Sequence, residues 1–149
     1  LSPHRMDVRG LRIGAVPLTL IDDSYNANID SMRAAVAALE AIGKGRRTIA
    51  VLSEMLELGE DSPATHRAVG AMLSGAAGVG ALIGLGGDAH YYSDGAASVP
   101  DRVLVEDPGA ALAAVLDRLT DDCVVLVKGS YNSNSWQVAD GLLEEATTR

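Results

Sequence analysis

Residues 19–32 read TLIDDSYNANIDSM and decide the fold class. The stretch passes from a short apolar run, through two acids and a group of small polar side chains, to the start of a helix. This order predicts the end of a strand, a polar loop and a helix N-terminus in succession. In open α/β sheets, ligands bind at the carboxyl ends of the strands, where loops of this kind lie. The loop from Asp22 to Asn28 is therefore the first candidate for a functional site.

A helix is expected to follow this loop and to end at Gly43 and Gly45. Asn28 is of a residue type that caps helix N-termini, although a capping role does not exclude a part in binding. The apolar residues that follow recur at helical spacing and share one face: Met32, Ala35, Val36, Leu39 and Ile42.

Downstream, apolar runs typical of strands alternate with helical patterns. Strands are expected at residues 48–52, 81–85, 102–105 and 123–127. One helix is expected from Ser62 as N-cap and Pro63 as first helical residue to about residue 75, and others follow Pro108 and cover 136–146. The helix after Pro108 should turn its leucines and valine inward: Leu112, Val115, Leu116 and Leu119. Residues 91–100 suggest a short helix and a loop, and residues 5–16 suggest one or two strands with a turn near Gly10.

This alternation predicts a Rossmann-like, three-layer α/β fold. The sheet should be mostly parallel, with helices on both faces and an N-terminal hairpin or antiparallel edge strand. At 149 residues the chain is expected to form a single domain, residues 1–149. The order of the strands within the sheet does not follow from the sequence.

Composition narrows the classes of partner. The net charge of −8 argues against a general surface for nucleic acid or membranes, since both need clustered Lys and Arg. No membrane insertion is expected. No apolar segment approaches the ~20 residues that span a bilayer and no signal peptide is visible, so a cytoplasmic setting is expected. The single Cys123 permits no internal disulfide, and its apolar neighbours favour a buried, inert thiol.

Four strand exits carry polar residues, and in a parallel sheet they open on one edge: DDSYNAN, SEMLELGE, GLGGD and KGSYNSNS. A nucleotide needs an acid for its ribose hydroxyls and amide side chains for its base or phosphates. Asp22 or Asp23 could supply the acid, with the other facing solvent or capping a turn, and Asn26 and Asn28 could supply the amides. The residues alone therefore indicate a domain that binds a nucleotide or another anionic ligand.

Other polar residues allow two interpretations each. Lys128, at the end of an apolar strand, either meets a substrate carboxylate or extends outwards from the strand end. His66 lies in the first turn of a helix and is expected to be structural or a supporting contact. No Walker A sequence, no metal-ligand spacing and no G-x-S-x-G motif is present in the chain.

Three stretches resemble one known family: IDDSYNANIDSMRAAVAAL at residues 21–39, AVLSEMLELGEDSPATHRAVG at 50–70 and VLVKGS at 125–130. They are similar to the C-terminal domain of the Mur ligases, most closely to members that add D-Ala-D-Ala to UDP-N-acetylmuramoyl-tripeptide. The resemblance implies an ATP-dependent amide ligase of peptidoglycan synthesis, and hence of cell-wall construction, cell shape and division. It also implies a need for Mg²⁺. The N-terminal substrate domain and the central ATPase domain would lie outside this chain, which should be inactive alone.

The resemblance also implies roles for individual residues. Arg5 would be catalytic, reaching the ATP γ-phosphate as the domain closes over ATP, because guanidinium forks onto phosphate oxygens. The remaining ATP contacts would come from Asp23 at the ribose hydroxyls, Asn26 and Asn28 at the adenine and phosphate side, and His4. The incoming dipeptide would meet Tyr25, Glu54, Lys128 and Ser130. No metal ligand is implied within this chain.

The sequence departs from the family pattern at Ile29, Ser53, Glu54 and Tyr131, where proline, glycine, aspartate and arginine are usual, and at His4, where glycine is frequent. The changes at Ser53 and Tyr131 bear on the dipeptide contacts more than on the ATP contacts. Two alternatives stay open: a Mur ligase with a different amino-acid acceptor, and a stand-alone, non-catalytic nucleotide-binding module. A Walker A sequence upstream of Leu1 would distinguish the ligases from the module.

Overall fold

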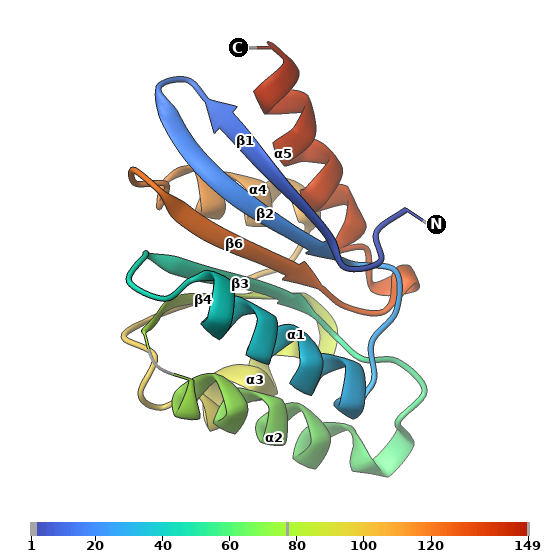
Figure 1. Cartoon of the computed structure of the whole chain (residues 1–149). Helices are drawn as coiled ribbons and strands as arrows, with labels where there is room; N and C mark the ends of the chain where they lie inside the picture. The colour runs from blue at the N-terminus through green and yellow to red at the C-terminus, as the bar shows by residue number, and fades with distance from the viewer. Residues whose placement is uncertain (1–2, 77, 149) are drawn as a thin grey trace.

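The computed structural model describes residues 3–76 and 78–148, which form a single sheet covered by helices (Figure 1). Its strands and helices follow one another along the chain as β1 (Asp7–Ile13), β2 (Val16–Asp23), α1 (Ile29–Ile42), β3 (Thr48–Ser53), α2 (Ser62–Gly75), β4 (Val79–Leu85), α3 (His90–Gly95), β5 (Asp101–Val105), α4 (Pro108–Leu116), β6 (Cys123–Lys128) and α5 (Trp136–Thr148). Among the described residues, no helix is both long and apolar enough to cross a bilayer.

The six strands lie in the order β1-β2-β6-β3-β4-β5. Only β1 runs antiparallel to its neighbour, β2, and the other described pairs are parallel. The last strand of the chain, β6, therefore lies between β2 and β3. The predicted α/β fold with an N-terminal antiparallel edge strand is confirmed, and the structure adds the strand order.

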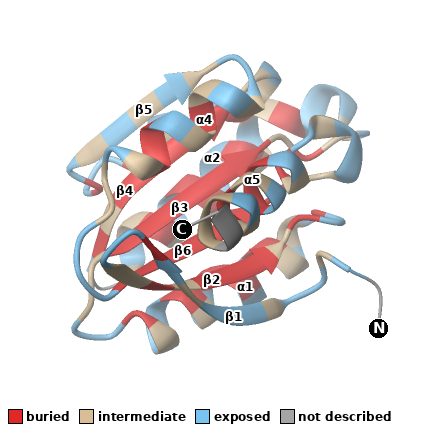
Figure 2. Ribbon diagram, turned by 90° about the horizontal axis from the view of Figure 1, so that it is seen from above, coloured by how far each residue is buried: buried red, intermediate tan, exposed pale blue. Residues whose placement is uncertain are grey.

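The core consists of two aliphatic layers, one on each face of the sheet. Helices α1, α2 and α3 pack on one face against residues such as Ala50 and Leu52. Helices α4 and α5 pack on the other face against the intervening residues of the same strand, Ile49 and Val51. Figure 2 shows the buried central strands lying between the helices. Because β3 and β6 are covered on both faces, all of their residues are buried, which explains their continuous apolar sequences.

Helix α1 forms as its sequence predicts. Asn28 is the N-cap: its Oδ1 accepts a hydrogen bond from the Ser31 backbone N–H, and the Ser31 hydroxyl oxygen accepts one from the Asn28 N–H. This reciprocal pair is a capping box, which satisfies two backbone donors that the helix itself cannot. The inward residues Met32, Ala35, Val36 and Leu39 are buried, and Ile42 packs at their margin.

Three local predictions differ from the structure. Gly10 lies within β1 opposite Thr19, and the chain instead reverses between β1 and β2 at Gly14, whose φ of 60° suits glycine. Ser62 is the first residue of α2 rather than its N-cap, and its hydroxyl contacts other side chains.

The predicted inward face of α4 is incomplete. Its buried residues are Ala111, Ala114 and Val115, and the predicted Leu112, Leu116 and Leu119 pack against the same core cluster while partly buried. Alanine dominates the sequence of this helix, so the spacing of its leucines did not identify the face that packs most closely.

Candidate functional site

The strand order brings three of the four polar loops together. Chains leaving β2 and β3 turn towards the α1–α3 face, whereas the chain leaving β6, which lies between them, turns towards α5. Such a reversal between neighbouring strands opens a crevice at their carboxyl ends. A groove of about 550 Å³ lies here, lined by Tyr25, Asn26, Ala27, Asn28, Leu56, Glu57, Leu58, Ser130, Tyr131 and Asn132. In Figure 1 these strand ends lie on the right.

The two acids that end β2 are both held by protein groups. Asp22 is buried and accepts hydrogen bonds from the Ser24 hydroxyl at 2.6 Å and from His4 Nδ1 at 2.7 Å. Asp23 accepts at Oδ1 from the Met6 backbone N–H, 2.9 Å away. The expectation that one acid faces solvent or caps a turn is therefore wrong, since both carboxylates bind the N-terminal segment.

Lys128 is buried at the end of β6, with only 1% of its surface exposed. Its ammonium donates to Asp23 Oδ2 at 2.9 Å, to the Asn26 carbonyl at 2.7 Å and to the Asp23 carbonyl at 3.4 Å. These contacts use its three N–H donors. Burial lowers the pKa of Lys128, while the hydrogen bond and ion pair with Asp23 act in the opposite direction. The side chain therefore does not extend outwards, and it ties β6 to the end of β2 and to the loop that follows.

The loop after β2 presents its two amides to the groove. Asn26 Oδ1 accepts from the neighbouring Ala27 N–H at 2.8 Å, which fixes the side chain close to the backbone. Asn28 Oδ1 serves the helix cap, so only its Nδ2 group is left to serve a ligand. Both residues line the groove, as the sequence suggested, and Asn28 combines this position with its capping role.

The loop after β3 is fastened to the loop after β6. Ser130 lines the groove, where its Oγ accepts from the Leu56 N–H at 2.9 Å, and its own N–H donates to the Glu54 carbonyl. His66 of α2 holds the loop after β3, because its Nε2 accepts a hydrogen bond from the Met55 N–H. Its Nδ1 bonds the Ser62 carbonyl. An Nε2 that accepts a hydrogen bond carries no proton, and burial lowers the pKa of His66 in the same sense. The expected structural role of His66 is confirmed.

Glu54 lies in a separate, smaller hollow beside the groove. This hollow measures about 190 Å³ and is lined by Glu54, Leu85, Gly86, Gly87, Glu106, Pro108, Asn132, Ser133 and Asn134. Glu54 Oε2 accepts from the Asp88 N–H at 2.9 Å, so the GLGGD loop supports Glu54 through its backbone. Only Asn132 lines both the groove and the hollow.

Aromatic side chains gather at this edge although the chain has only four tyrosines and one tryptophan. Tyr131 stacks on Trp136 with ring centroids 5.4 Å apart, and Tyr25 lies 5.6 Å from Tyr131. The Arg5 guanidinium lies 4.0 Å above the Tyr25 ring, an arrangement that favours a cation. Arg5, His4 and Tyr25 are therefore brought together beside the groove.

A model of the family described as Mur ligase, glutamate ligase domain matches residues 4–131. The chain belongs to this family. The match covers the loops after β2 and β3 and the first residues of the loop after β6, as far as Tyr131.

Curated relatives of this Mur ligase domain are named UDP-N-acetylmuramoyl-tripeptide--D-alanyl-D-alanine ligase. The relative from Mycobacterium leprae is 36% identical over the whole of this chain, and that from Mycobacterium tuberculosis (strain H37Rv) is 38% identical over 99% of it. The relative from Escherichia coli K12 is 34% identical over 86% of the chain. The chain spans about a third of the length of the two mycobacterial relatives, 32% in each case.

Solved structures share the fold of this Mur ligase domain. A MurF ligase from Thermotoga maritima, solved in complex with ADP, matches the whole chain with a TM-score of 0.77 at 23% identity. MurF from Acinetobacter baumannii matches 96% of the chain with a TM-score of 0.80 at 24% identity. The chain covers 32% and 31% of those two proteins, respectively.

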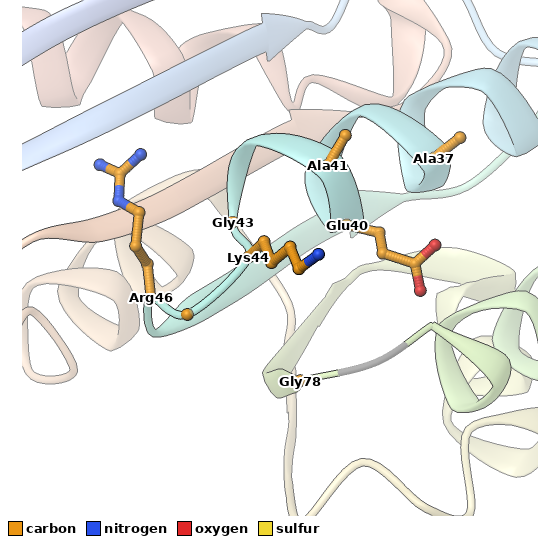
Figure 3. A pocket seen from close by; sticks show the side chains of 8 residues that line it. Ala37, Glu40, Ala41, Gly43, Lys44, Arg46 and Gly78 are labelled. Carbon is orange, nitrogen blue, oxygen red and sulfur yellow. The ribbon is translucent and has the colours of Figure 1, made fainter.

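A further hollow, of about 520 Å³, lies at the opposite edge of the Mur ligase domain's sheet, between the end of α1 and Gly78 (Figure 3). Figure 3 shows the Arg46 guanidinium pointing away from Lys44. Arg46 bonds the Thr19 hydroxyl at 2.8 Å and pairs with Asp122 at 2.8 Å, so it joins the end of α1 to the start of β6. Although this hollow is similar in size to the groove, none of the four polar strand exits lines it.

Sequence reasoning missed part of the groove of the Mur ligase domain. The residues that it did not name are Ala27, Leu56, Glu57, Leu58 and Asn132, while Tyr131 was noted only as a departure from the family pattern. Leu56, Glu57 and Leu58 lie within SEMLELGE, where no pattern separates residues that face a groove from those that face the core.

Proposed function

We propose that the chain is the C-terminal domain of an ATP-dependent ligase that joins D-Ala-D-Ala to UDP-N-acetylmuramoyl-tripeptide. The names of the curated relatives support this substrate pair. The chain covers about a third of the length of the mycobacterial relatives, 32% in each case. We therefore assign the binding of the UDP-linked substrate and the cleavage of ATP to other domains of the whole ligase. The site of action is the cytoplasm, where activated precursors and ATP are both available.

The observation that carries the proposal is the groove, into which the loops after β2, β3 and β6 all open. On its ATP side lie Asn26 and Asn28, with Arg5 and His4 in the adjoining N-terminal segment and Asp23 behind the loop. No described residue accepts a hydrogen bond from the Arg5 guanidinium, so its planar fork is available for a phosphate when the domain closes over ATP. Asp23 keeps lone pairs for a ribose hydroxyl, since a carboxylate offers about four acceptor positions.

On the dipeptide side lie Tyr25 and Ser130 in the groove and Glu54 in the adjoining hollow. An ammonium group is matched by the Glu54 carboxylate, and the Ser130 O–H is a donor for a carboxylate or carbonyl. Lys128 acts on this side only indirectly, because its donors hold Asp23 and Asn26.

Mg²⁺ is not assigned to this domain. Among the described residues no group of three or more His, Cys, Asp and Glu side chains is arranged to hold a metal ion. We assign the metal and most contacts to the ATP phosphates to the rest of the ligase, so the domain contributes Arg5 and the groove to a shared site.

Turnover by the whole protein that carries this chain tests the proposal. Phosphate release from ATP should require both UDP-N-acetylmuramoyl-tripeptide and D-Ala-D-Ala, and single amino acids should not replace the dipeptide. Turnover with another acceptor would assign the chain to a different Mur ligase. The absence of turnover with any acceptor, together with tight ATP binding by the 149-residue chain alone, would favour a binding module.

The Arg5→Ala variant tests the proposed catalytic role. The whole ligase should lose most of its turnover while the domain stays folded, because Arg5 is exposed and makes no contact deep in the core. Arg9→Ala is the matched control, since Arg9 is an exposed arginine of β1 whose one ion-pair partner among the described residues is Asp7. Unfolding of the Arg5→Ala domain, or equal losses in both variants, would contradict a catalytic role.

A further inference from the structure

The N-terminal segment, residues 4–6, is bonded to the end of β2 and to the loop that follows it. His4 Nδ1 lies 2.7 Å from Asp22 Oδ2, and the His4 carbonyl accepts from the Tyr25 N–H at 3.0 Å. The Met6 N–H donates to Asp23 Oδ1 at 2.9 Å. Arg5 lies between these two attachments, with its guanidinium on the Tyr25 ring. The position of Arg5 is therefore set by contacts of both its neighbours.

The two carboxylates that hold this segment are themselves fixed from behind. Asp22 is 3% exposed, and its second oxygen accepts from the Ser24 hydroxyl. Asp23 Oδ2 accepts from Lys128, whose ammonium also holds the Asn26 carbonyl. Lys128 lies in β6, which pairs with β2 and β3 along its length. The attachment of the N-terminal segment thus extends into the most buried part of the sheet.

The backbone on either side of Arg5 adopts a conformation that needs external support. His4 has a φ of 64° and Met6 a φ of 42°, in the left-handed region that side chains other than glycine rarely occupy. A residue in this conformation is strained and persists only where its surroundings hold it. The Asp22 and Asp23 contacts are those surroundings, because they bond His4 and Met6, the two residues concerned.

We propose that Asp22, Asp23 and Lys128 form a clasp that positions Arg5 for the ATP phosphates. The clasp consists of the chain of contacts from Lys128 through Asp23 to Met6, and the contact from Asp22 to His4. This rests on the proposed function for the role of Arg5, and it assigns Lys128 and Asp22 as positioning residues that touch no substrate. It also gives Asp23 a task distinct from accepting a hydrogen bond from the ribose.

The clasp acts on kcat through Arg5 alone, and this can be measured in the whole ligase. Lys128→Met removes the cation that fixes Asp23 while keeping an unbranched side chain in the core. Its kcat should fall roughly 10- to 100-fold, because small misplacements of a catalytic group have effects of this size. In the Arg5→Ala background the same change should lower kcat by no more than about twofold, since Arg5 is the group being positioned. An equal loss in both backgrounds would overturn the proposal, because Lys128 would then act by another route.

Asp23→Asn separates positioning from ribose binding. The Met6 N–H and the Lys128 ammonium bond different oxygens of Asp23, and an asparagine keeps an oxygen at only one of these two positions. If Asp23 positions Arg5, kcat falls, whereas loss of the proposed ribose contact raises the KM for ATP, so the two roles are measured by separate constants. A raised KM with unchanged kcat would overturn the positioning role. Asp7→Asn is the control, because Asp7 is in β1 next to the segment and pairs only with Arg9.

Hydrogen exchange supplies a readout that does not depend on turnover. In the whole protein the Met6 and Tyr25 amides should be protected, and Asp23→Ala should speed exchange at Met6 while Asp7→Ala leaves it unchanged. Equal protection of Met6 in the wild type and in Asp23→Ala would show that no clasp exists. Loss of protection in a protein without ligase turnover would instead confirm the clasp and contradict the proposed function.

Discussion

Asn28 is the residue at which capping and binding can be separated most cleanly. Its Oδ1 accepts from the Ser31 N–H at 2.8 Å, and the residue also lines the groove. Asn28→Ala removes this one hydrogen bond but leaves the bond from the residue 28 N–H to the Ser31 hydroxyl. The loss of an N-cap side chain costs about 1 kcal/mol, within a range of ~0.5–2. For a chain of this size the melting temperature should fall by roughly 2–4 °C.

Asn28→Asp should keep the cap and lose the amide donors. Aspartate caps helices about as well as asparagine, and its negative charge favours a helix N-terminus by ~0.3–1 kcal/mol. The free energy of unfolding should therefore equal the wild-type value or exceed it by up to about 1 kcal/mol. In the whole ligase, however, both Asn28→Ala and Asn28→Asp should raise the KM for ATP, because neither side chain carries the Nδ2 group.

Asp107 provides the matched control. It caps α4 with the same geometry, accepting from the Ala110 N–H at 2.8 Å, and it does not line the groove. Asp107→Ala should cost about as much stability as Asn28→Ala, ~1 kcal/mol, and leave the KM for ATP unchanged. Urea denaturation of the chain and steady-state kinetics of the ligase measure the two effects separately. If Asn28→Asp destabilises the chain as much as Asn28→Ala, the cap is not the cause, and if its KM for ATP is normal, Asn28 only caps the helix.

Three further predictions concern the support beneath the site. Gly70→Ala should destabilise the chain by about 1–3 kcal/mol in urea denaturation, because a Cβ would clash with the Tyr92 carbonyl and lie 3.0 Å from Ala96 N. Gly75→Ala in the same helix is the control, since its Cβ meets nothing within 4 Å and the change should be neutral or slightly stabilising. Equal effects of the two changes would refute the steric argument. Tyr92→Phe should lower the free energy of unfolding by about 0.5–1.5 kcal/mol with an unchanged m-value, since it removes only the hydrogen bond from the Tyr92 hydroxyl to the Ser53 carbonyl. A variant as stable as the wild type would show that this bond is dispensable. Burial lowers the pKa of His66 from 6.5, so between the folded and unfolded pKa values of this residue the unfolded chain binds more protons than the folded chain. The free energy of unfolding should therefore fall as the pH drops below about 6.5. This pH dependence should be weaker in His66→Gln, and an identical pH profile in that variant would contradict the assignment to His66.

The sequence identified the parts of the site better than their partners. DDSYNAN, SEMLELGE and KGSYNSNS could be recognised as strand exits because buried parallel strands are continuous apolar runs. Their meeting at one groove could not be predicted, because it depends on β6 lying between β2 and β3, and no local pattern encodes strand order.

The partners of charged side chains were equally hidden. Lys128 and Asp23 are 105 residues apart, and their contact follows from the pairing of β6 with β2. From the sequence, Lys128 could meet a substrate carboxylate or extend outwards, because a lysine at the end of an apolar strand gives no sign of which carboxylate will meet it. The hairpin turn was misplaced for a simpler reason: Gly10 and Gly14 both fit a turn, and only the register of β1 on β2 selects Gly14.

The position of β6 has a consequence for how the groove comes into being. Among the described pairs, β6 is the strand that joins the β1–β2 hairpin to the β3–β4–β5 group. Until β6 docks, the two sides of the groove belong to two pieces of chain that share no sheet hydrogen bonds, so the groove does not exist as a local unit of structure. A molecule bound there would therefore oppose the separation of the sheet into two parts. Its binding should raise the free energy of global unfolding, in addition to reducing the motion of the loops around the groove.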